Sequence, residues 1–193
     1  EKVFIKGSEA ASNGLEFDGL QARVGAGTSQ YIENQSANSG ALSFAALDEA
    51  LDAVDAVGGQ KYLVMSKAAR RALTAGSRNG GINGGIHIST DEIGRQRTMY
   101  ADTPVLITDR DERNQEILGA TEANSTTSIY VVSFGDTALT GIQNGGIEVR
   151  DLGEATDKPQ MVTRIEWYCG LALMNGRAVS RLAKIDPTLA AVA

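Results

Sequence analysis

Hydrophobic and polar residues alternate most regularly in residues 161–174, MVTRIEWYCGLALM. A two-residue period is that of a β-strand with one packed face and one polar face. We therefore predict that this segment is the longest strand of the chain. Its packed face would consist of Met161, Thr163, Ile165, Trp167, Cys169, Leu171 and Leu173, and its polar face would carry Arg164, Glu166 and Tyr168. On the packed face, Cys169 is expected to be an inert core thiol.

Shorter apolar runs predict further strands. Residues 128–135 (SIYVVSFG) are rich in β-branched and aromatic side chains, and residues 61–66 (KYLVMS) form a short buried run. The segment 97–109 predicts two extended pieces around Thr103-Pro104, and residues 1–24 are interpreted as short strands separated by polar turns.

A helical period marks the segment that follows Ser43. Ser43 is a suitable N-cap, and Leu47, Leu51 and Val54 recur at the spacing of one helical face. Gly58 is expected to end this helix in the left-handed conformation. Ser66 predicts the cap of a second helix, which would stop at Gly76, and residues 177–185 predict a short closing helix.

Residues 25–41 and 77–96 are rich in glycine and polar side chains, which predicts loops. A loop as long as 77–96 is uncommon inside a domain and is often functional. Strands outnumber helices in this interpretation, so the predicted fold class is mixed α+β.

Composition narrows the possible functions. The chain has 193 residues and a formal net charge of -6, which argues against general binding to nucleic acid phosphates. With one cysteine and one histidine, no disulfide can form within the chain, and these two residues are too few for a zinc site, which normally takes three or four such ligands. No stretch of the sequence is apolar enough to predict a membrane span or a signal peptide.

Two glycine motifs suggest phosphate binding but lack its other requirements. Gly25-x-Gly27 follows an apolar run, yet Gln30 stands where a dinucleotide-binding turn needs a third glycine, and the next helix starts only near Ser43. The run 79–85 (NGGINGG) has no Gly-Lys pair after it, so a loop is the favoured interpretation.

Other candidates for chemistry are equally incomplete. The acidic set Asp48, Glu49, Asp52 and Asp55 could bind a divalent cation, but a solvated helix face is the favoured interpretation. His87 could be a general base, although no nucleophile elbow accompanies it. No catalytic, cofactor-binding or metal-binding residue is therefore predicted, which favours a structural or binding protein over an enzyme.

Basic residues gather in the middle of the chain without interleaved aromatic side chains. They are Lys67, Arg70, Arg71, Arg78, Arg95 and Arg97. Two interpretations remain open for them, an ordinary solvated surface and a subunit interface that meets an acidic neighbour. The acidic helix face or the mixed run 109–116 (DRDERNQE) could supply the acidic half.

The order of segments resembles the major capsid proteins of tailed phages. The residues that carry this resemblance are EKVFIKG…EFDGLQARV with its Phe17-Asp18-Gly19-Leu20 turn, LSFAALDEALDAV…KYLVMSKAARRAL, MYADTPVLITD, SIYVVSFGD and RIEWYCGLALMNGRAVSRLAKI. Each match is weak alone, but together they follow the order of the family over nearly the whole chain. Asp102 departs from the pattern, because a glycine usually occupies that position before the proline, so the turn there is expected to differ.

The resemblance implies a fold with an axial and a peripheral lobe. Residues 15–157 would form the axial-like lobe, and residues 1–14 and 158–193 would form what remains of the peripheral-like lobe. The N-terminal arm, extended loop and spine helix of the family would precede Glu1 and are expected to be missing. A strand face that the spine helix normally covers would then expose apolar surface near Trp167.

The resemblance also implies a structural function, that of a head subunit that self-assembles into the pentamers and hexamers of an icosahedral phage or prophage shell. The expected partners are copies of the chain itself, scaffold and other head proteins, and enclosed DNA that is not bound by sequence; no membrane partner and no cofactor are implied. The loop 77–96 is a candidate for the capsomer axis. The alternatives are an encapsulin-type nanocompartment, a small hydrolase that uses the His87 loop, and a monomeric binding module.

Overall fold

The computed structural model describes residues 1–34, 40–55, 58–79, 86–90, 94, 96–155 and 157–192. Its central strands are β2 (Gln60–Ser66), β6 (Thr127–Phe134) and β9 (Val179–Ile185). Apolar side chains on both faces of these strands require a covering layer on each side. One core cluster contains Leu63, Met65, Ile129, Val131 and Leu182, whereas the second contains the alternating residues Val64, Tyr130, Val132 and Val179.

The central strands belong to a mixed sheet of nine strands in the described part of the chain. Its main path runs β1-β9-β6-β2-β5-β4-β3, with β1 (Tyr31–Glu33), β3 (Ile86–Thr90), β4 (Gln96–Tyr100) and β5 (Thr103–Thr108). The pairs β1–β9 and β2–β5 are parallel, and the other pairs on this path are antiparallel. The predicted α+β class is confirmed, as are the strands near 61–66 and 128–135 and the two extended pieces around Thr103-Pro104.

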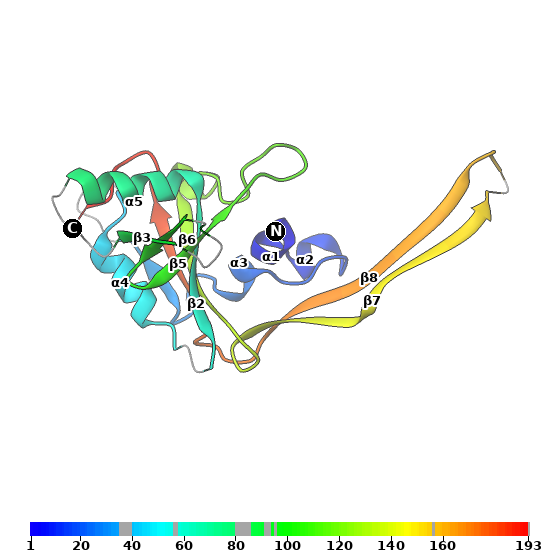
Figure 1. The fold of residues 1–193 in the computed structure, drawn as a ribbon, viewed down its shortest axis with the longest axis horizontal. Helices are drawn as coiled ribbons and strands as arrows, with labels where there is room; N and C mark the ends of the chain where they lie inside the picture. Colours follow the sequence, from blue (N-terminus) through cyan, green and yellow to red (C-terminus); the bar gives the residue numbers. More distant parts are fainter. Residues whose placement is uncertain are drawn as a thin grey trace.

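Two helices cover one face of the sheet, α4 (Phe44–Asp52) and α5 (Lys67–Asn79) (Figure 1). Both predicted caps are confirmed, because Ser43 Oγ accepts from the Ala46 amide at 3.5 Å and Ser66 Oγ accepts from the Ala69 amide at 3.1 Å. Both predicted ends were wrong. The first helix stops at Asp52, and the chain then turns so that the Asp55 amide donates to the Arg177 carbonyl.

Gly58 has a φ of 75° but lies in the turn before β2, outside the helix. The second helix continues through Gly76, where a Cβ atom would lie 2.4 Å from the Ala191 carbonyl oxygen. Gly76 therefore allows the C-terminal segment to approach the helix closely, rather than ending it.

The N-terminal segment covers the other face of the sheet. It forms three short helices, α1 (Lys2–Lys6), α2 (Glu9–Ser12) and α3 (Leu20–Arg23), so the strands predicted for residues 1–24 were wrong. Apolar runs of four or five residues do not distinguish a helix from a strand, which explains the error. Ile5, Leu20 and Val24 reach the second core cluster from these helices.

The closing segment also differs from its prediction. Residues 177–185 predicted a helix, but β9 is a strand between β1 and β6, with all its residues buried except Lys184. The predicted loop 77–96 is partly ordered as well: residues 77–79 end α5, and β3 and β4 form a hairpin. Residues 80–85, which contain most of the glycine run 79–85, lie outside the described residues.

The longest strand is β7 (Leu139–Glu154), which pairs with β8 (Met161–Leu173) as an antiparallel arm. The sequence predicted β8 within the limits 161–174 but gave no strand for β7. Figure 1 shows the arm reaching far out from the body of the molecule, while α1, α2 and α3 lie beside its root. The other strands of the sheet lie in the body.

Candidate assembly interface

The arm packs against the body at its root, the end where Leu139 pairs with Leu173, and most of its residues beyond the root are exposed. Pairing begins at Leu139 with Leu173 and ends at Glu154 with Met161. At the root, Leu139 and Leu171 belong to the second core cluster, and the Arg23 guanidinium donates to the Leu171 carbonyl at 2.8 Å. From Gly141 to Arg150 every residue of β7 is exposed.

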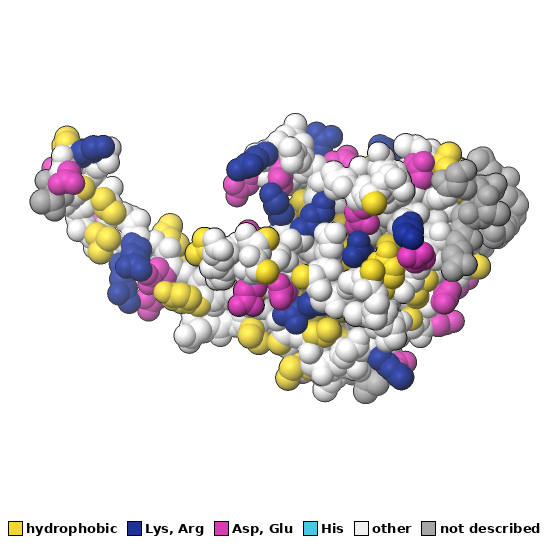
Figure 2. All heavy atoms as spheres, turned by 180° about the vertical axis from the view of Figure 1, so that it is seen from behind, with side chains coloured by type: hydrophobic (Ala, Val, Ile, Leu, Met, Phe, Trp, Pro, Cys, Tyr) yellow, Lys and Arg dark blue, Asp and Glu magenta, His cyan; other side chains and the backbone are white. Residues whose placement is uncertain are grey.

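One side of the arm carries apolar side chains, which we call the apolar face: Val149, Met161, Ile165 and Trp167. Val149 and Ile165 lie directly opposite each other in the register, and Trp167 is two residues further along β8 on the same side. Their exposed fractions are 64% for Val149, 68% for Ile165, 55% for Trp167 and 74% for Met161. Figure 2 shows hydrophobic side chains along the length of the arm.

The structure corrects one part of the prediction for 161–174 and confirms another. The alternating residues do share a face, but only its root is packed, so Cys169 is exposed and is not a core thiol. The expected exposed apolar surface near Trp167 is confirmed. An uncovered apolar face of this size typically indicates an interaction site.

The opposite side of the arm is charged. Glu148 is paired with Glu166 in the register, and Arg150 is paired with Arg164, so each rung carries two like charges. Ion pairs run along the strands instead, from Arg150 to Glu148 at 2.8 Å and from Arg164 to Glu166. The arm therefore has an acidic rung nearer the body and a basic rung nearer the tip.

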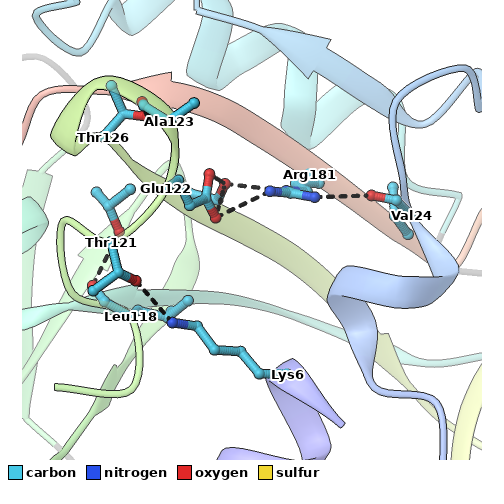
Figure 3. A network of polar contacts seen from close by, with 10 residues as sticks. Lys6, Val24, Leu118, Thr121, Glu122, Ala123, Thr126 and Arg181 are labelled. Atoms are coloured by element: carbon cyan, nitrogen blue, oxygen red, sulfur yellow. Dashed lines mark hydrogen bonds and ion pairs between the residues drawn. The ribbon is translucent and has the colours of Figure 1, made fainter. Parts of the chain in front are cut away.

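A network of polar contacts around Arg181 joins several segments of the body (Figure 3). The Arg181 guanidinium donates to Glu122 at 3.0 Å, to Ser128 Oγ at 3.0 Å and to the Val24 carbonyl at 3.4 Å. It also lies over the Tyr31 and Tyr130 rings, 5.5 Å and 5.8 Å from their centroids. One side chain of β9 thus joins the end of α3, strand β1 and the 118–127 segment.

Ionisation in this network follows from burial. Lys6 donates to Thr121 Oγ1 at 3.0 Å, and desolvation lowers the pKa of Lys6 although the nearby Glu122 opposes that shift. Desolvation also raises the pKa of Tyr130, against the effect of Arg181. The Arg181–Glu122 pair is mostly buried, whereas the Lys6–Thr121 contact is exposed, and the buried part is suited to holding the fold rather than to proton transfer.

The structure separates the residues that the sequence singled out for chemistry. Gly25 and Gly27 form a turn after α3 that leads into β1, so no helix N-terminus points at them. His87 is exposed on the β3–β4 hairpin with Nε2 3.5 Å from Asp102 Oδ1. Among the described residues, no cluster of histidine, cysteine or acidic side chains could hold a metal ion.

The acidic residues near α4 are divided between two contacts. Asp48 accepts a hydrogen bond from the Tyr100 hydroxyl at 2.7 Å, and burial together with that bond raises the pKa of Tyr100. Asp55 lies beyond the helix and pairs with Arg177 at 3.2 Å. Glu49 and Asp52 are exposed on the helix, as the solvated interpretation expects.

The basic residues gather on and after α5. Lys67 pairs with Asp109 at 2.7 Å, an exposed contact that contributes to lowering the pKa of Asp109 together with the Arg110 amide. Arg71 and Arg78 are exposed and Arg70 is half-buried, while Arg97 lies on β4. Arg95 lies outside the described residues.

Two solved structures of shell proteins share this fold. The holo-SrpI encapsulin complex from Synechococcus elongatus PCC 7942 is 20% identical, with a TM-score of 0.66 over 90% of this chain and 58% of that chain. The capsid of an empty GTA particle is 17% identical, with a TM-score of 0.54 over 96% of this chain and 60% of that chain. This chain therefore spans less than two thirds of either protein.

No family model matches the sequence, and no curated protein matches it. The resemblance to the major capsid proteins of tailed phages is thus confirmed at the level of the fold, which encapsulins and phage-type capsids share. None of the described helices is long and apolar enough to cross a membrane.

Proposed function

We propose that this chain is a shell subunit, copies of which assemble through head-to-tail contacts into the pentamers and hexamers of an icosahedral container. The observation that carries this proposal is the fold, which two shell proteins share over 90% and 96% of the chain. The open arm supports it, because a projecting hairpin with an uncovered apolar face is suited to contact with a neighbour.

We further propose that the body is the axial-like lobe and the arm is part of the peripheral-like lobe. The sequence-based division placed residues 15–157 in the axial-like lobe and residues 1–14 and 158–193 in the peripheral-like lobe. Because β7 pairs with β8, and β9 lies inside the main sheet, we place 139–173 in the peripheral-like lobe and 179–192 with the body. The β3–β4 hairpin lies at the end of the body away from the arm (Figure 1), which supports its place at the capsomer axis.

The apolar face of the arm is exposed among the described residues, which supports a further layer that covers it. In this family that layer is the spine helix, and Val149, Ile165 and Trp167 would lie beneath it. Since the chain has one tryptophan, Trp167, its fluorescence reports on this face alone. We expect its emission to lie at shorter wavelength where that helix covers the face than in this chain alone, because the covered indole leaves water.

The content of the shell is proposed to be DNA, as in a phage or prophage head found in the virion and assembled in the bacterial cytoplasm with scaffold and other head proteins. The similarity to an encapsulin supports a second candidate, a nanocompartment that encloses proteins. In both cases the net charge of -6 agrees with a wall that does not adhere tightly to nucleic acid.

Electron microscopy of the complete gene product tests the proposal. Closed shells or capsomer rings are expected. Small single particles under all assembly conditions would contradict a shell function. In purified shells, DNA that resists nuclease would indicate a phage head, whereas co-purifying protein cargo without DNA would indicate an encapsulin.

A further inference from the structure

The outer edge of β8 is unpaired. In the described part of the chain, β8 pairs only with β7, so the backbone groups on its other edge face solvent along the arm. A long exposed edge of this kind is a template for pairing with another strand.

The two strands of the arm differ in how well they protect their edges. β7 carries extra residues at two places, between Asn144 and Glu148 and between Asp151 and Glu154. Such bulges twist a strand and hinder further pairing. β8 has no extra residue opposite them, and it contains β-branched and aromatic side chains that favour pairing. The edge of β8 is therefore the one open to a new strand.

The sequence of β8 is complementary to itself around Ile165. In an antiparallel pair of two β8 strands centred on Ile165, Arg164 of each copy would lie opposite Glu166 of the other. Further out, Val162 would lie opposite Tyr168, which are 38% and 63% exposed. The Ile165 side chains, at 68% exposure, would meet each other at the centre. Opposite charges and apolar pairs are the cross-strand neighbours that stabilise a sheet.

We propose that β8 pairs edge to edge with β8 of a second copy of this chain, antiparallel about a two-fold axis at Ile165. The contact joins two arms into one four-stranded sheet. This proposal adds a specific contact between copies to the proposed shell function. It rests on that function in one respect, the choice of a second copy of the chain as the partner. The Arg164 side chain is 61% exposed and that of Glu166 is 17% exposed. A charge pair that remains open to water on one side supplies little energy, so these two residues mainly set the register, while backbone pairing and Ile165 supply the attraction.

Cysteine cross-linking of the full chain tests the register. In a background with Cys169→Ser, Ile165→Cys is expected to give a disulfide-linked dimer under mild oxidation, because directly opposed residues of antiparallel strands have Cα atoms about 4.5–5.5 Å apart. Val149→Cys is the matched control, since Val149 lies opposite Ile165 on β7 with nearly the same exposure. A failure of Ile165→Cys to cross-link, or equal cross-linking of both variants, would overturn the proposal.

Charge exchange tests the pairing itself by sedimentation velocity. Arg164→Glu alone and Glu166→Arg alone are each expected to weaken dimerisation by about tenfold or more, because like charges then oppose each other. An equimolar mixture of these two variants, or one chain with both changes, is expected to restore it. The corresponding changes on β7, Glu148→Arg and Arg150→Glu, are matched controls and should have little effect. Absence of rescue, or an equal effect of the β7 controls, would overturn the contact.

The two proposals fail separately. Closed shells in which the Ile165→Cys variant forms no cross-link would reject this contact and leave the shell function standing. A specific cross-link in a chain that never forms shells or rings would support the contact and contradict the shell function.

Discussion

The body and the arm use the same kinds of residues in opposite ways. Strand β6 in the body has β9 and β2 as neighbours and a packed layer on each face, and seven of its eight residues are buried. Strand β8 in the arm has one neighbour, and only its root is covered. The comparison shows that the core of the body is covered on both sides by segments of this chain, whereas the apolar face of the arm is covered by none of the described residues. Stability should therefore depend on the body, and association on the arm.

Two arginine–glutamate pairs, one in the body and one in the arm, give the largest expected contrast in stability. Arg181 and Glu122 are mostly buried, with side-chain exposures of 10% and 14%. On the arm, Arg164 is 61% exposed and Glu166 is 17% exposed, so the contrast lies in the arginine. Removing one partner of a buried pair leaves an uncompensated charge, so Arg181→Met should lower the free energy of unfolding by about 3–5 kcal/mol. Arg164→Met should cost less than about 1 kcal/mol. Urea unfolding measures both, and similar losses for the two variants would contradict the division between body and arm.

A pair of apolar truncations gives the next contrast. Leu63 is fully buried in the body, so Leu63→Ala should destabilise by about 2–5 kcal/mol through lost contacts and a cavity. Ile165→Ala should change stability by less than about 0.5 kcal/mol, since Ile165 is exposed, but it should weaken association. Thermal unfolding and sedimentation of the same samples separate the two effects. An Ile165→Ala variant that unfolds as easily as Leu63→Ala would show that the arm has a core of its own.

The sequence predicts the body better than the arm, for physical reasons. Two-sided burial produces continuous apolar runs, so the strands around Leu63 and Tyr130 were recognisable, and the Ser43 and Ser66 caps located the starts of two helices. The alternation in 161–174 gave β8 and its two faces correctly. It did not show what covers them, because the pattern is the same whether the covering layer lies in this chain or elsewhere.

The errors arise where local sequence carries little information. Strand β9 was predicted as a helix because it buries Ser180 and Arg181, whose polar groups are satisfied by tertiary partners that include the Ala50 carbonyl and Glu122. The partner strand β7 was missed because exposed residues on both sides remove the alternation that marks a strand. The helix α2 left a signal that the prediction did not use, the Ser8 cap followed by Asn13 in the left-handed region.

Substitutions on the surface of α5 test whether the body, as well as the arm, contacts a neighbouring subunit. Their expected effect is smaller than that of the preceding substitutions. Arg71 is exposed, so Arg71→Glu in the complete protein should preserve folding and reduce capsomer assembly by about tenfold if a neighbour presents acidic groups there. Arg70→Glu should act in the same direction but also destabilise, since Arg70 is half-buried and the substitution places a carboxylate partly out of water. Assembly is measured by light scattering against the unsubstituted protein. Unchanged assembly of the Arg71→Glu variant would place α5 on open surface.

The smallest expected change in stability concerns the turn between β4 and β5. At Asp102 in this turn, the chain departs from the pattern of the capsid proteins. Tyr100 pairs with Thr103, and the two residues between them both have positive φ, 44° for Ala101 and 60° for Asp102. This is the geometry of a two-residue hairpin turn, in which glycine is favoured and alanine is strained. Ala101→Gly should therefore stabilise the body by about 0.5–1 kcal/mol despite the added freedom of the unfolded chain.

The same change in a helix provides the control. Ala45 is exposed in α4, where glycine costs about 1 kcal/mol, so Ala45→Gly should lower the midpoint of thermal unfolding while Ala101→Gly raises it. The emission of Trp167 should stay unchanged in both variants before unfolding, because the tryptophan lies on the arm. A loss of stability for Ala101→Gly would mean that the turn relaxes out of the left-handed region in solution.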